Sequence, residues 1–114
     1  MKSYTDLEQS KKLAEILPLK SADMRFCFSH TLSGRIVGHY PMIGREPSSG
    51  TIPCWSLAAL LDAMPKIVNN ETLFIETSAS LWHIGYRNVY TARAANLFDA
   101  CYELILRLHE LKLL

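Results

Sequence analysis

Residues that could carry out chemistry are few and widely spaced in this chain. The thiol of Cys54 opens the apolar run "GTIPCWSLAALLDAMPK" (residues 50–66), and a cysteine at a helix amino terminus can have a lowered pKa and act as a nucleophile. Three histidines could serve as its base after folding: His30, His39 and His83. No signature of a cysteine enzyme surrounds Cys54, so we expect it to be buried beside Trp55 as part of the packing.

The histidines do not form a recognisable metal site. His39 and His83 fall at strand positions opposite the apolar alternation, and we expect both on the open face of a sheet. Paired ligand spacing such as HxH or HxxxH is missing among the four histidines. The sequence therefore predicts no metal and no cofactor.

Arginines alternate with aromatic residues along the expected strands, in the way that sheets which bind single-stranded nucleic acid are built. Such a sheet needs its rings on the exposed face, whereas here the rings alternate onto the apolar face. A formal net charge of +1 also gives no general attraction to nucleic acid. Nucleic acid is kept as an alternative partner. The candidate binding residues on the open sheet face are Arg25, Arg35, His39, His83 and Arg87.

Length and composition are those of one globular domain, residues 1–114. Apolar residues make up 49% of the chain and charged residues 20%, which argues against disorder. The cysteines are odd in number, lie far apart and form no CxxC pair: Cys27, Cys54 and Cys101. Reduced thiols, the lack of an apolar signal core and the lack of a long apolar run predict a cytoplasmic protein with no membrane partner.

The first half of the chain predicts a helix and a hairpin. Thr5 followed by Glu8 forms a capping box for an amphipathic helix that Pro18 ends. Alternation predicts strands over 24–29 and 36–40, joined by "TLSG", in which Gly34 can take a positive φ. Residues 41–53 carry three prolines and two glycines and predict a loop, with a short strand at 42–43.

The second half predicts helix, hairpin and helix. Leucines and a methionine at i, i+3, i+4 and i+7 predict a helix over 57–64 with a complete core face. Alternation predicts strands over 73–77 and 81–87 around the turn "TSAS". Asn96 is a plausible cap for the longest helix, in which Glu103 and Arg107 are spaced for an i, i+4 ion pair.

We therefore predict an α+β protein in the order α-ββ-α-ββ-α. Two hairpins are expected to make one antiparallel sheet of four to five strands, with three helices mainly on one face. The other face of the sheet must then be exposed to solvent or covered by a partner. No glycine-rich phosphate loop, paired-carboxylate arrangement or GxSxG motif occurs, so we do not expect a common enzyme.

Three stretches carry a resemblance that spans nearly the whole chain: "LEQSKKLAEILPLKSADM" (7–24), "TIPCWSLAALLDAMP" (51–65) and "NLFDACYELILRLHEL" (96–111). They resemble an uncharacterised family of small proteins from Bacteroides-type gut bacteria, often encoded in phage-like or mobile regions. That family has no established function, so the resemblance implies a bacterial cytoplasm and no activity. Where the family has "DNPxDAC" before the last helix, this chain has "AANLFDAC" and lacks the proline that would start that helix.

The element order is also similar to that of type III secretion chaperones, which are small dimers that bind an unfolded segment. The closing hairpin and helix look like HicB-type antitoxins. These analogies order the functional hypotheses. The first is a small non-catalytic module, of mobile-element origin, that binds a protein partner or a second copy of itself. A nucleic-acid-associated regulator of antitoxin type is second, and an enzyme that uses Cys54 is third.

Overall fold

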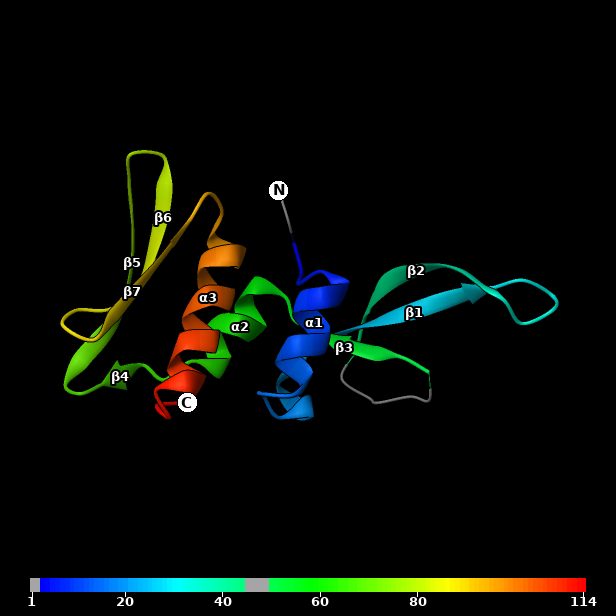
Figure 1. Ribbon diagram of the computed structural model, residues 1–114, viewed down its shortest axis with the longest axis horizontal. Helices are drawn as coiled ribbons and strands as arrows, with labels where there is room; N and C mark the ends of the chain where they lie inside the picture. Colours follow the sequence, from blue (N-terminus) through cyan, green and yellow to red (C-terminus); the bar gives the residue numbers. More distant parts are fainter. Residues whose placement is uncertain (1–2, 45–49) are drawn as a thin grey trace. The chain divides into compact units, whose positions relative to one another are not determined.

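The computed structural model describes residues 3–44 and 50–114. Its contacts group into two compact units, the N-terminal unit (residues 3–59) and the C-terminal unit (residues 60–114), shown in Figure 1. In chain order the elements are α1 (Leu7–Ala14), η1 (Leu19–Ser21), β1 (Met24–His30), β2 (Ile36–Ile43), β3 (Ile52–Cys54), α2 (Leu57–Ala63), β4 (Ile67–Val68), β5 (Glu71–Ser78), β6 (Leu81–Tyr86), β7 (Tyr90–Ala94) and α3 (Leu97–Glu110).

The N-terminal unit is built on a three-stranded antiparallel sheet with β1 in the centre, between β2 and β3. Helix α1 lies against β3, and the β1–β2 hairpin extends beyond this helix (Figure 1). The buried apolar side chains come from the helix, the sheet and the segment after β3: Leu13, Leu17, Ala22, Phe26, Cys54 and Trp55. The core of this unit therefore lies at the base of the hairpin.

Helix α1 begins one residue later than the sequence predicted. Asp6, and not Thr5, is the N-cap: the Gln9 amide donates to Asp6 Oδ1 at 2.8 Å, and the Asp6 amide donates to Gln9 Oε1 at 3.2 Å. The predicted capping box of Thr5 with Glu8 was wrong because Thr5 has another role. Its buried hydroxyl accepts from the Trp55 amide at 3.1 Å.

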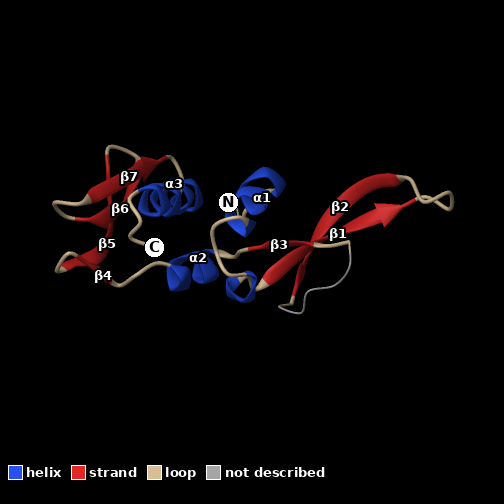
Figure 2. Ribbon diagram, turned by 60° about the horizontal axis from the view of Figure 1, so that its bottom comes forward, coloured by secondary structure: helices blue, strands red, loops and turns tan. Residues whose placement is uncertain are grey.

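The C-terminal unit is a four-stranded antiparallel meander, in the order β4-β5-β6-β7, with α3 packed against β6 and β7 (Figure 2). The predicted cap of the last helix is confirmed, because Asn96 Oδ1 accepts from the Asp99 amide at 2.9 Å. The core of this unit consists of apolar side chains from the sheet and from α3: Ile84, Tyr86, Ala92, Phe98, Cys101, Leu104, Ile105 and Leu108.

The α+β class is confirmed, and both predicted hairpins are present, but the strands form two sheets in place of the single one expected. Three short strands were not predicted: β3, β4 and β7. The expected loop over 41–53 is strand at both ends, since β2 continues to Ile43 and β3 begins at Ile52. Residues 45–49 of that loop lie outside the described residues.

The hairpin turns use different means to reach a positive φ. Gly34 takes φ 88° in the β1–β2 turn, where a residue without a Cβ pays no steric cost. The two-residue β4–β5 turn uses Asn69 and Asn70, a residue type that tolerates this region. In the β5–β6 turn Ala79 and Ser80 have φ 52° and 64°, which neither residue type favours.

Candidate functional site

The chemical state of Cys54 is the reverse of what a nucleophile needs. Its side chain is 0% exposed and stands opposite Met24 of β1. Burial, with smaller contributions from Asp23 and Cys27, raises the pKa of the Cys54 thiol to about 12. A thiol with this pKa is protonated at neutral pH, whereas a reactive cysteine has a lowered pKa. The structure places Cys54 in the core, as the sequence predicted.

The polar groups of Trp55 and Ser56 form hydrogen bonds to other segments of the N-terminal unit. The Ser56 amide donates to Asp23 Oδ1 at 2.9 Å, and the Ser56 hydroxyl bonds to the other carboxylate oxygen. The hydroxyl of Ser56 also accepts from the Ala59 amide at 3.2 Å, which caps the start of α2. The indole of Trp55 donates to Ser21 Oγ at 3.0 Å. These bonds tie the start of α2 and the segment before it to η1 and to Asp23, the residue that precedes β1.

The five predicted binding residues lie on two different sheets. Arg25 and His39 are in the N-terminal sheet, and Arg35 immediately precedes β2. His83 is in β6 of the C-terminal sheet, and Arg87 directly follows that strand. The sequence treated all five as one open face, whereas no single sheet contains them.

His39 lies on the opposite face of its sheet from Arg25. It stands across from Phe28 in the β1–β2 register, and its ring meets the ring of Phe26 edge-on, with centroids 5.3 Å apart. Residues that face each other across neighbouring strands share a sheet face, so His39 belongs to the aromatic face. The sequence predicted the other face for His39, because it assumed that the apolar residues of this strand all lie on one side.

The C-terminal sheet does bring cationic and aromatic groups together. The guanidinium of Arg87 lies over the ring of Phe74, with 4.4 Å from Cζ to the centroid, and forms an ion pair with Glu76 at 3.5 Å. His83 Nε2 is 2.9 Å from Ser78 Oγ. Sequence reasoning missed Phe74, although strand alternation already set it on the side of Glu76. Because Arg87 is engaged by both neighbours, this group stabilises the face of the sheet.

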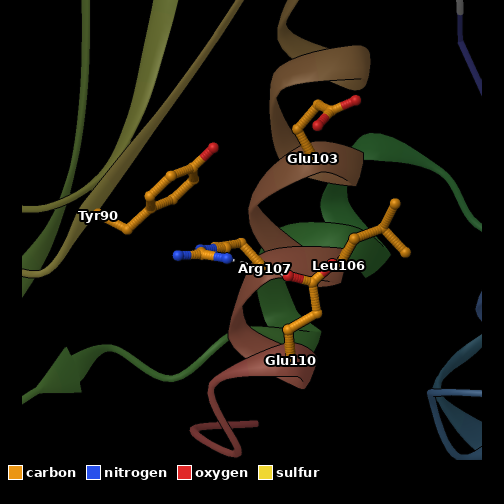
Figure 3. Close-up of a pocket in the computed structure, with 5 residues that line it drawn as sticks. All are labelled: Tyr90, Glu103, Leu106, Arg107 and Glu110. Carbon is orange, nitrogen blue, oxygen red and sulfur yellow. Dashed lines mark hydrogen bonds and ion pairs between the residues drawn. The ribbon is translucent and has the colours of Figure 1, made fainter.

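A small open pocket lies between β7 and α3. Its volume is about 270 Å³, below the range of about 300–1,000 Å³ for small-molecule sites. Figure 3 shows Arg107 extending from α3 toward Tyr90, with 5.5 Å from Cζ to the ring centroid. Arg107 also pairs with Glu110 at 3.0 Å, so the ion pair with Glu103 that the sequence predicted is replaced. Arg107, the cationic group that lines the pocket, is therefore already engaged by Tyr90 and Glu110.

Among the described residues, the two most exposed large apolar side chains, Leu32 and Ile43, lie on the β1–β2 hairpin. We call residues 24–43, which comprise β1, β2 and the turn between them, the hairpin arm. Its exposed large apolar side chains are Leu32, Ile36, Val37, Tyr40, Met42 and Ile43. The β1–β2 register puts Tyr40 and Met42 on the face of Arg25, and Ile43 on the face of Phe26. Apolar side chains are therefore exposed on both faces of the arm.

In the part of the chain that the structure describes, the outer part of the hairpin arm has no third strand. Strand β3 pairs only with Met24, Arg25 and Phe26, so β1 pairs with β2 alone beyond Phe26. Both outer strands of the sheet contain a proline, Pro41 in β2 and Pro53 in β3. Proline cannot donate a ladder hydrogen bond and is confined to such edges, where it hinders the addition of another strand.

Within residues 3–44 and 50–114, no group of three or more histidine, cysteine or acidic residues could hold a metal ion. In the same ranges, no helix has the length and apolar character that a membrane crossing requires. No protein-family model, curated protein or solved structure matches the chain.

Proposed function

We propose that this chain is a small non-catalytic module that binds another protein through the hairpin arm. The observation that carries the proposal is the exposure of apolar side chains on both faces of the arm, including Val37 at 62% and Ile43 at 85%. Single exposed apolar residues are common on protein surfaces, but a contiguous group marks an interaction site. Here the group follows one strand, β2, for its whole length.

The architecture of the arm supports the same function. An isolated two-stranded hairpin is marginally stable in water, and stability normally needs a third strand or a packed helix. Among the described residues, the arm has no third strand beyond Phe26, and no helix packs extensively on β1 or β2. A protein surface laid on one of its faces would supply the missing burial. Pro41 disfavours the addition of a strand along the β2 edge, which favours contact through the faces there.

We propose a bacterial cytoplasm as the setting for this module. All three cysteines are free, which suits a reducing compartment. A mobile-element origin is part of the proposal and depends on the resemblance of the three sequence stretches alone.

Site-specific photo-crosslinking tests the proposal. A benzophenone amino acid replaces Val37 on the arm, and in a matched control it replaces Thr77, an exposed strand residue of the C-terminal unit. After irradiation in the native host, we expect one protein adduct from position 37 and none from position 77. The captured protein, once identified and purified, must then bind the chain in calorimetry, and the double variant I36S/Y40S must weaken that binding at least tenfold.

Two outcomes would contradict the proposal. Equal adducts from both positions, or a captured protein whose affinity I36S/Y40S leaves unchanged, would show that the arm is not the binding surface. Circular dichroism of I36S/Y40S checks that the variant is folded. Both residues are exposed, so we expect its spectrum to match that of the unsubstituted chain.

A further inference from the structure

We infer that the surface which docks on the hairpin arm is an acidic, apolar segment of another protein. This inference rests on the proposed function and adds the chemical class of the partner. The chain as a whole is almost neutral, with 12 lysines and arginines against 11 acidic residues. The arm is not: residues 24–43 contain no aspartate and no glutamate.

The arginine beside the turn of the arm is placed where a partner would meet it. Arg35 is exposed beside the turn and forms no ion pair with any described residue. His30 and His39 are exposed on the same two strands, among the apolar side chains. An apolar surface with only positive charge at its margin is complementary to an apolar segment that carries carboxylates.

The same charge argues against a second copy of the arm as the occupant. Two arms laid face to face would bring arginine toward arginine with no acidic side chain between them, and like charges across an interface cost affinity. Two copies docked in this way would also have to bury both sets of imidazoles. A dimer through the arm is therefore disfavoured by the chemistry of the arm itself.

Nucleic acid fits the arm less well than an acidic protein does. Affinity for nucleic acid grows with the number of phosphates that lysine and arginine neutralise. The arm has two arginines, Arg25 and Arg35, against six exposed large apolar side chains. Phosphates would leave those side chains in water, whereas an apolar and acidic protein segment would cover them.

Synthetic peptides and a DNA duplex test the class of partner. The probes are a fluorescein-labelled peptide in which glutamate alternates with valine, the same peptide with lysine, the same peptide with glutamine, and a labelled duplex. We expect fluorescence anisotropy to show binding of the glutamate peptide alone, weakened by added salt. The variant R35E should weaken this binding about fivefold and give measurable binding of the lysine peptide.

Other outcomes overturn the inference. Failure of the glutamate peptide to bind, or binding of the glutamine or lysine peptide just as tightly, shows that the partner is not acidic. Preferential binding of the duplex, with a steep dependence on salt, makes nucleic acid the occupant. A concentration-dependent dimer in sedimentation velocity that I36S/Y40S abolishes makes it a second copy. The crosslink at position 37 is scored separately, so arm docking can stand when the acidic partner fails.

Discussion

Phe74 of β5 stands directly across from Gly85 of β6, and there is no room for a side chain at Gly85. A Cβ at that position would lie 2.1 Å from the carbonyl oxygen of Tyr90 and 2.7 Å from Cα of Thr91. Both atoms belong to the backbone of β7, so no rotamer change could relieve the contact. The ring of Phe74 packs instead against the guanidinium of Arg87, two residues after the glycine.

The first prediction concerns the close approach of β7 at Gly85. Gly85→Ala should lower the free energy of unfolding by about 3 kcal/mol or more, because β7 must move away from β6. Urea denaturation measures the loss. Gly38→Ala is the matched control in the other sheet, since nothing lies within 4 Å of a Cβ there. Equal stability of the two variants would mean that β6 and β7 are not as close as described.

The second prediction concerns the β5–β6 turn. Replacing Ala79 and Ser80 by Asn and Gly should raise the free energy of unfolding by about 1 kcal/mol, because these residues accept a positive φ at both central positions. Ser33→Gly is the control, since Gly34 and not Ser33 takes the positive φ in the β1–β2 turn. Thermal unfolding compares the variants, and no gain in the N-G variant would contradict the turn geometry.

The third prediction concerns the buried hydroxyl of Thr5. Thr5→Val keeps the shape but removes the acceptor of the Trp55 amide, which leaves a buried N–H without its partner. The expected loss is about 1–3 kcal/mol of unfolding free energy. Thr77→Val, at an exposed strand position, should change stability little. Chemical denaturation measures the loss, and an unchanged free energy of unfolding in Thr5→Val would contradict the buried hydrogen bond.

The fourth prediction concerns the buried thiols. At neutral pH a thiol reagent should label Cys27 in the folded chain, and Cys54 and Cys101 only after unfolding, because the latter two are 0% exposed. Rapid labelling of Cys54 in the folded state would revive its candidacy as a nucleophile. Mass spectrometry of the labelled peptides identifies the sites.

Alkaline pH should destabilise the fold through the same two thiols. Burial raises the pKa of Cys54 and of Cys101 from 9.0 to about 12. Their contribution to stability is fully present below pH 9 and is lost as the pH rises toward 12, since only the unfolded state releases these protons. The variant C101A should show a shallower decline of stability above pH 9 than the unsubstituted chain, measured by urea titration at each pH.

Local signals in the sequence predicted the parts of the fold that depend on neighbours in the chain. The Asn96 cap, the turn with Gly34 and the two hairpins each depend on residues close together in sequence, and the structure has all of them. The short strand β3 depends on pairing with β1, more than twenty residues earlier. Its own sequence, Ile-Pro-Cys, gives no alternation to read, so it was predicted as loop.

Strand partners and sheet faces could not be predicted from the sequence, because they too depend on residues far apart in the chain. Alternation of apolar and polar residues marks a strand but does not say which strand it pairs with. The four predicted strands were therefore placed in one sheet, whereas the structure has two sheets. On β2 the apolar residues Ile36 and Val37 are neighbours, at a point where the register with β1 shifts, so alternation could not define one face. Register decided the face of His39, and register is a property of the pair of strands.

Pro41 and Pro53 also bear on how this chain behaves at high concentration. An uncharged apolar strand at the edge of a sheet can pair with the same strand of another molecule. Repeated pairing of this kind, through main-chain hydrogen bonds, produces fibrils. A proline ring nitrogen interrupts that growth along β2, at Pro41, and at the base of the N-terminal sheet, at Pro53. A chain of this kind can expose apolar side chains and still resist the growth of sheets from one molecule to the next along these edges.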